Sequence, residues 1–198
     1  VNGYAMMLKE DFEDKLDAEG NRLINTVMTN ARLMGQLIDD LLAFSRIGKK
    51  EIVFATVNMN ALVKACVVAN EKSKCQFKVH TLPPCKADIN LLRQVLLNLV
   101  GNAIKYSSKT DNPKIEIGSI KDDAKLTYYI KDNGVGFDMK YKHKLFGVFQ
   151  RLHRNDEFEG TGVGLALTKQ IIDKHGGTIW AEAYPGKGAT FYFSMPNE

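Results

Sequence analysis

The chain has 198 residues, of which 44% are hydrophobic and 25% are charged, a balance that argues against a disordered or membrane protein. The net charge of +4 is too small to indicate a nucleic-acid-binding protein, because no basic block or aromatic-interleaved stripe accompanies it. The chain has three cysteines without metal-ligand spacing, which fits free thiols in a reducing compartment. It shows no signal peptide and no apolar run near the ~20 residues of a membrane span. We therefore expect a cytoplasmic chain without direct membrane contact.

The first 48 residues are expected to form a helical hairpin. Asp17 is a plausible N-cap for the second helix, and Gly48 with Lys49 and Lys50 is expected to end it. Residues 1–16 have helical spacing of their own. The second helix carries apolar or small residues alternately three and four positions apart: Ile24, Val27, Ala31, Met34, Ile38, Leu41 and Ser45. A hairpin of this size buries too little surface alone, so a second hairpin is expected to cover the seam. The alternative is a helical appendage of the main domain.

The remaining residues alternate between strand and helix patterns. Strands are predicted at 52–57, 76–81, 114–120, 125–130, 178–183 and 190–195, and helices at 60–70, 88–107 and 164–175. A polar turn at 121–123 joins two of the strands. The segment 150–160 is charged and aperiodic, which indicates a loop.

The helix predicted at 88–107 has two contrasting faces. One face is apolar, whereas Asn98, Asn102 and Lys105 share a stripe on the other, at i, i+4 and i+7. Amide oxygens and an ammonium group that point the same way suit a Mg²⁺–phosphate group. Gly101 on that face would let a ligand approach the backbone. The alternative is a solvated polar face.

A second candidate group, 132–137, follows a predicted strand and reads Asp-Asn-Gly-Val-Gly-Phe. Glycines permit a sharp turn close to a flat ligand. A buried Asp132 at the end of the strand would accept a hydrogen bond from the exocyclic amine of adenine, where guanine presents a carbonyl. Taken alone, this run is better explained by an ordinary turn.

The third group, 159–165, reads Glu-Gly-Thr-Gly-Val-Gly-Leu and precedes an apolar helix. Free backbone N–H groups at such a helix start bind anions. The segment is not a P-loop, because no Gly-Lys-Ser/Thr ends it, and it is not a dinucleotide fingerprint, because it does not follow a strand.

These groups, in this order, resemble the histidine kinases of two-component systems, within the ATP-binding superfamily that includes gyrase-, Hsp90- and MutL-type ATPases. Residues 98–107 resemble the family's N box, 132–137 its G1 box, 146–149 its F box and 160–165 its G2 box. Residues 41–46 (Leu-Leu-Ala-Phe-Ser-Arg) are typical of the last turns of the dimerisation and phosphoacceptor domain. Residues 150–196 look most similar to phytochrome-like sensor kinases.

The resemblance implies an α+β fold, in which a mixed sheet covered by helices on one face forms a two-layer sandwich after the helical hairpin. It divides the chain into a partial dimerisation and phosphoacceptor domain at 1–48 and an ATP-binding catalytic domain at 49–198. ATP and Mg²⁺ are the implied ligands. Asn102 would bind Mg²⁺ with Asn98 beside it, Lys105 would bind phosphate, Tyr106 would lie against the nucleotide and Asp132 would accept the adenine amine.

The resemblance also implies a set of residues that close around the nucleotide: Gly134, Gly136, Gly160, Thr161, Gly162, Val163, Gly164 and Leu165. Leu167 and Thr190 would line the adenine pocket. Arg151 and His153 belong to the loop that acts as a mobile lid in the family, and would reach the phosphates when it closes. His153 is equally well explained as a surface histidine.

Three functions compete: a kinase that phosphorylates histidine, a gyrase- or Hsp90-like ATPase, and a non-catalytic nucleotide-binding module. The hydrolytic relatives place a glutamate where this chain has Asn98, and an amide cannot act as the general base for water. The kinase is therefore favoured, with a response regulator receiver domain as partner and a homodimer through the hairpin. The chain's histidines are His80, His143, His153 and His175, so the phosphoacceptor histidine is absent from the hairpin.

Overall fold

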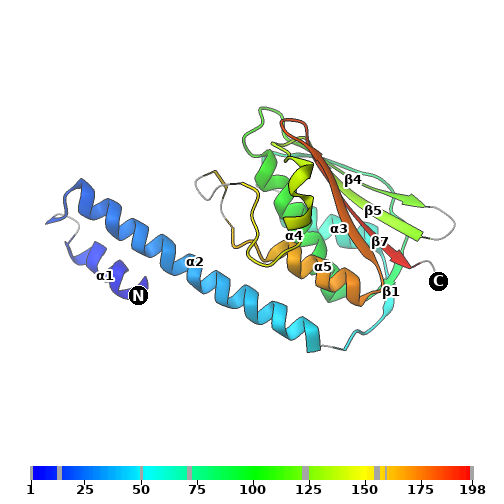
Figure 1. Cartoon of the computed structure of the whole chain (residues 1–198), viewed down its shortest axis with the longest axis horizontal. Coiled ribbons are helices and arrows are strands. Elements are labelled where there is room, and N and C mark those ends of the chain that lie inside the picture. Colours follow the sequence, from blue (N-terminus) through cyan, green and yellow to red (C-terminus); the bar gives the residue numbers. More distant parts are fainter. Residues whose placement is uncertain are drawn as a thin grey trace.

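The computed structural model describes residues 2–12, 15–49, 51–70, 73–121, 125–153, 157–158 and 160–196. It begins with the predicted helical hairpin, formed by α1 (Asn2–Phe12) and α2 (Ala18–Lys49). Asp17 caps α2 as predicted, because its Oδ1 accepts a hydrogen bond of 2.7 Å from the backbone N–H of Gly20. Figure 1 shows α2 as a long helix that runs from the hairpin to the α/β part of the chain.

The α/β part is built on a five-stranded mixed sheet in the order β2-β4-β5-β7-β6. Its strands are β2 (Gln76–Val79), β4 (Lys114–Lys121), β5 (Lys125–Asp132), β6 (Thr178–Tyr184) and β7 (Gly188–Pro196). β2 pairs with β4 in parallel, and the other neighbours pair antiparallel. The turn predicted at 121–123 lies partly outside the described residues.

Two short elements were not predicted. β3 (Cys85–Ala87) pairs antiparallel with β1 (Ala55–Val57), and a 3₁₀ helix, η2, spans Met139–Lys144. Three residues are too few to show an alternating pattern, so β3 has no signal of its own. Its pairing with β1 depends on a contact between distant parts of the chain.

Helices α4 (Ile89–Ser107) and α5 (Gly164–Lys174) pack on one face of the sheet, and α3 (Met59–Val68) packs beside α4. Figure 1 shows these helices on the same side of the strands. The core between the layers consists of buried apolar residues, including Leu92, Leu96, Leu99, Ile115, Ile117, Tyr128, Ile130, Ile171 and Phe193. The predicted α+β architecture, a hairpin followed by a mixed sheet with helices, is confirmed.

The orientation of α4 follows from its amphipathic sequence and its cap. The Asp88 carboxylate accepts hydrogen bonds from the backbone N–H groups of Asn90 and Leu91, at 2.9 and 3.1 Å, which fixes the first turn. Because the apolar stripe faces the sheet, the polar stripe predicted to carry Asn98, Asn102 and Lys105 faces away from it.

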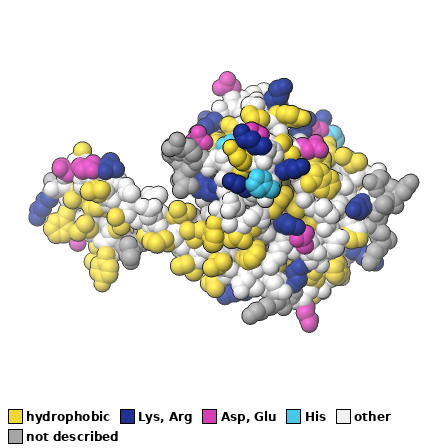
Figure 2. Space-filling view, in the orientation of Figure 1, with side chains coloured by type: hydrophobic (Ala, Val, Ile, Leu, Met, Phe, Trp, Pro, Cys, Tyr) yellow, Lys and Arg dark blue, Asp and Glu magenta, His cyan; other side chains and the backbone are white. Residues whose placement is uncertain are grey.

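The hairpin leaves much of its apolar seam uncovered in the single chain. Val27, Met34, Ile38 and Leu41 are 46%, 51%, 60% and 48% exposed. Figure 2 shows hydrophobic side chains spread over the hairpin. No helix in the described part of the chain has the length and apolarity that a membrane crossing requires.

Candidate functional site

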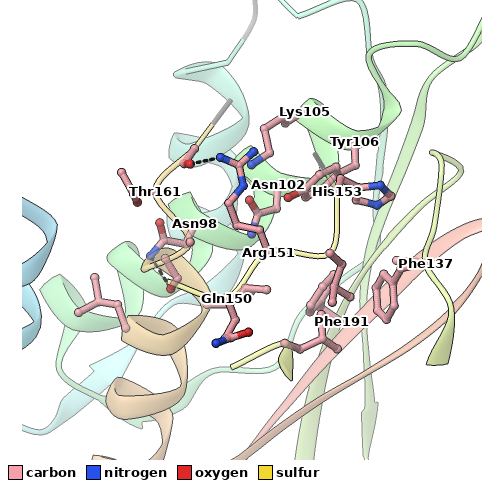
Figure 3. Close-up of a pocket in the computed structure, with 18 of the residues that line it drawn as sticks. Asn98, Asn102, Lys105, Tyr106, Phe137, Gln150, Arg151, His153, Thr161 and Phe191 are labelled. Atoms are coloured by element: carbon pink, nitrogen blue, oxygen red, sulfur yellow. Dashed lines mark hydrogen bonds between the residues drawn. The ribbon is translucent and has the colours of Figure 1, made fainter. Parts of the chain in front are cut away.

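A cavity of about 270 Å³ lies between the polar face of α4, the loop after β5, the segment before α5 and one end of β7. Most of the residues predicted to form a site line it: Asn98, Asn102, Lys105, Tyr106, Asp132, Gly136, Arg151, His153, Gly160, Thr161, Gly162, Gly164, Leu165 and Leu167. Figure 3 shows Asn98 and Thr161 at one end of this cavity and Phe137 and Phe191 at the other. Predicted residues from α4, from 132–136, from 151–153 and from 160–167 are therefore brought to one cavity.

Three predicted residues do not line the cavity. Gly134 packs on the end of α4, where an added Cβ would lie 2.3 Å from the Tyr106 carbonyl oxygen, and Val163 is fully buried. The prediction that Thr190 lines the cavity is wrong. Its strand neighbours Ala189 and Phe191 line the wall, and alternate residues of a strand point to opposite faces, so Thr190 lies on the outer face.

The cavity also contains residues to which the sequence analysis assigned no role: Asp40, Gln94, Phe137, Leu145, Gln150, Leu152, Ala189 and Phe191. Gln94 lies one helical turn before Asn98, so the polar stripe contained a signal for it. Asp40 had no such signal, because it comes from α2 and is 121 residues away from Thr161, which it contacts.

Asp132 provides the polar group at one end of the cavity. The residue is only 4% exposed, and its Oδ1 accepts hydrogen bonds from the backbone N–H groups of Gly134 and Ala189, at 2.9 and 3.3 Å. Burial raises the pKa of Asp132 to about 6, although both hydrogen bonds act in the opposite direction. A buried carboxylate whose ionisation is this costly is a typical feature of a ligand site.

The polar stripe of α4 provides the other end. Asn98 Nδ2 donates to the Gly164 carbonyl at 3.3 Å, which ties the stripe to the start of α5. Burial lowers the pKa of Lys105, and the nearby Arg151 guanidinium lowers it further. Two cations held together in a partly buried site favour an anionic ligand, because an anion would relieve their mutual repulsion.

Glycines shape the two loops around the cavity. Gly136 has a φ of 60°, and an added Cβ would lie 2.1 Å from the Tyr184 carbonyl oxygen. Gly162 has a φ of 75° and lies against the backbone of Gln150. Both positions therefore require glycine for conformation as well as for space.

Arg151 and His153 anchor the described residues of the segment 150–160 to their surroundings. The Arg151 guanidinium donates to the backbone carbonyls of Phe158 and Gly160. His153 Nε2–H donates to the Gly136 carbonyl at 3.0 Å, and its ring centroid lies 5.2 Å from that of Tyr106. In this arrangement both side chains hold the loop, with His153 on the Gly136 side of the cavity. Glu159 lies outside the described residues.

Comparison with known proteins identifies the family. Residues 87–198 match the family described as "Histidine kinase-, DNA gyrase B-, and HSP90-like ATPase". Cyanobacterial phytochrome A of Nostoc sp. is 38% identical over 200 residues, which cover 99% of this chain and 26% of the relative. The chain belongs to the histidine kinases. The phytochrome-like protein Cph1 of Synechocystis sp. is 35% identical, and the match covers 99% of this chain and 27% of Cph1. The signal transduction histidine-protein kinase AtoS of Escherichia coli is 32% identical, and the match covers 99% of this chain and 32% of AtoS.

Solved histidine kinases share the fold. The kinase ThkA in complex with the response regulator TrrA has a TM-score of 0.71 and 26% identity, and the match covers 98% of this chain and 57% of that one. Full-length ShkA in complex with AMPPNP has a TM-score of 0.70 and 25% identity, over 98% of this chain and 42% of that one.

These matches confirm that this histidine kinase chain contains the catalytic, ATP-binding region of two-component signalling proteins. The predicted similarity to phytochromes is also confirmed. The chain spans about a quarter of the length of the cyanobacterial relatives.

Proposed function

We propose that this chain binds Mg-ATP in the cavity and transfers the γ-phosphoryl group to a histidine on a phosphoacceptor helix, for relay to an aspartate of a response regulator. The observation that carries this proposal is the polarity of the cavity. A buried carboxylate lies at one end, and two amides with two cations lie at the other. This arrangement complements a nucleotide, whose base carries an amine and whose phosphates carry negative charge.

Each end of the cavity would then have its own task. Asp132 would accept a hydrogen bond from the adenine amine, and Tyr106 would lie beside the nucleotide. Lys105 would contact the phosphates as a point charge. The amide oxygens of Asn98 and Asn102 fit Mg²⁺, which prefers a few protein oxygens together with phosphate oxygens and water. Bound there, Mg²⁺ would neutralise charge on the phosphates.

Asn98 supports phosphoryl transfer to a protein rather than hydrolysis. An amide cannot accept a proton, so water near Asn98 would have no general base at that position. The site would work mainly by positioning and charge stabilisation, while another domain supplies the nucleophile. Loop residues 151–153 would close over the nucleotide and exclude water.

The partners follow from the same proposal. ThkA was crystallised with its response regulator, which supports a receiver domain as the partner of this chain. The exposed seam on α2 supports a homodimer through a four-helix bundle. The division at residue 48 remains a prediction, as does a cytoplasmic location, which the free cysteines Cys66, Cys75 and Cys85 support.

The test is phosphoryl transfer from γ-labelled ATP. The chain alone should bind ATP, release phosphate slowly and remain unlabelled, because its hairpin carries no histidine. A separately purified two-helix domain with the histidine should become labelled when the chain is added, and the label should be acid-labile and base-stable. The same domain with histidine replaced by glutamine is the control. Rapid phosphate release by the chain alone would instead support the hydrolytic alternative.

A further inference from the structure

Asp40 places a carboxylate from the dimerisation hairpin in the wall of the nucleotide cavity. It lies on α2, whereas the other lining residues come from α4 and later elements. Asp40 Oδ2 accepts a hydrogen bond from the Thr161 hydroxyl, which lies between Gly160 and Gly162 in the glycine-rich segment. A residue of α2 thus contacts the glycine-rich segment that would surround the phosphates.

The contact depends on how α2 packs against α5. Phe44 and Ile47 of α2 pack against the main core. Lys174 Nζ donates to the carbonyls of Ile47 and Gly48, at 2.8 and 3.2 Å, and so places a cation at the C-terminal end of α2. Asp40 lies seven residues, about two helical turns, before Ile47 and therefore on the same face of α2.

Asp40 lies at the cationic end of the cavity. Thr161 follows Gly160, whose added Cβ would lie 3.2 Å from Lys105 Nζ, and the Gly160 carbonyl accepts from Arg151. Figure 3 shows Thr161 on the side of the cavity away from Phe137 and Phe191. A carboxylate at this end opposes the positive potential that phosphates require. It also occupies the Thr161 hydroxyl, which could otherwise donate to a phosphate oxygen.

We propose that Asp40 competes with the nucleotide's phosphate groups, so that docking of α2 against the glycine-rich segment lowers the affinity for ATP. This inference rests on the proposed function, because it assumes that phosphates occupy this end. By linkage, ATP binding loosens the contact between α2 and the segment to the same extent. Any force on the hairpin that moves Asp40 away then raises ATP affinity without a change in the residues that bind ATP.

The experiment compares Asp40→Asn with Asp39→Asn in the complete chain. Both substitutions remove one negative charge from α2, but Asp39 is exposed and does not line the cavity. Calorimetry with adenosine, ADP and Mg-ATP measures the dependence on phosphate number. For Asp40→Asn we expect the dissociation constant to fall about tenfold for ATP, by less for ADP and not at all for adenosine. Asp39→Asn should change none of them.

Two further measurements separate repulsion from a structural effect. The gain for ATP should shrink as salt is raised from 0.05 to ~0.5 M, because salt screens charge repulsion. In a Thr161→Val background the same Asp40→Asn change should have a smaller effect, since the docking contact is already lost. Asp40→Ser provides a second neutral variant, should Asp40→Asn not fold.

Different results would refute the inference about Asp40 and the proposed function. Unchanged ATP affinity in a folded Asp40→Asn chain, or an equal gain for adenosine, would overturn the inference. Weaker ATP binding that is confined to Mg²⁺-containing buffer would overturn it too, since Asp40 would then support the metal. Absence of ATP binding by the parent chain would instead refute the proposed function.

Discussion

Replacing Asp132 with asparagine should stabilise the fold and weaken nucleotide binding. Burial raises the pKa of Asp132 from 3.8 to about 6, so the folded chain holds the proton more tightly than the unfolded chain does. Each pKa unit corresponds to about 1.4 kcal/mol, so ionised Asp132 costs the fold about 3 kcal/mol at pH 7 relative to the protonated acid. Asparagine has the shape of the protonated acid and keeps an oxygen for the N–H groups of Gly134 and Ala189.

The pH dependence has a defined sign. Because the pKa is raised in the folded state, the stabilisation from protonating Asp132 is complete below about pH 3.8 and is lost as pH rises through about 6. Asp132→Asn should therefore gain up to about 3 kcal/mol over the parent chain at pH 7 and almost nothing at about pH 3. Urea unfolding followed by the fluorescence of the single tryptophan, Trp180, measures this difference. Asp111→Asn, at an exposed position, should show no such gain.

ATP binding should move in the opposite direction. The amide nitrogen of asparagine would face the adenine amine with a second donor, and a charge-assisted hydrogen bond would be lost, which weakens ATP binding by about 1–3 kcal/mol at pH 7. In the parent chain, affinity should fall about tenfold per pH unit below about 6, relative to the same titration of Asp132→Asn. Calorimetry that shows GTP bound as tightly as ATP, or a destabilised Asp132→Asn at pH 7, would refute this reasoning.

Three other changes test separate parts of the site and hairpin. His153→Ala removes the hydrogen bond to the Gly136 carbonyl and the ring contact with Tyr106, so labelled ATP should dissociate about tenfold faster in a stopped-flow measurement. His153→Phe keeps an aromatic ring and should restore part of the slow dissociation. Unchanged dissociation rates would show that the loop does not retain the nucleotide. Asn102→Ala should lose the Mg²⁺-dependent part of ATP affinity, measured by calorimetry with Mg²⁺ or EDTA, and an equal loss in EDTA would contradict a metal role. In a longer chain that carries a histidine-containing helix before residue 1, Ile38→Glu should convert a dimer into a monomer in light scattering, whereas a monomeric parent would contradict the bundle.

The sequence by itself determined the elements whose pattern is long and periodic. The apolar stripe of α4 predicts both the helix and the face that the sheet covers, so the common orientation of Asn98, Asn102 and Lys105 follows from 3.6 residues per turn. The sequence also predicted that the glycines of the two loops around the cavity are needed for their backbone conformation. At Gly136 the left-handed backbone and the close approach of the Tyr184 carbonyl admit no other residue without strain.

Tertiary structure decided what depends on contacts between distant segments. β3 exists through its pairing with β1, and the register of β7 turns Thr190 away from the wall that Ala189 and Phe191 form. Arg151 is bound to two loop carbonyls, which no spacing rule predicts. Asp40 reaches the cavity only because α2 packs against α5. Periodicity reports which face of an element is buried, whereas the partner of that face is set by the packing of the whole chain.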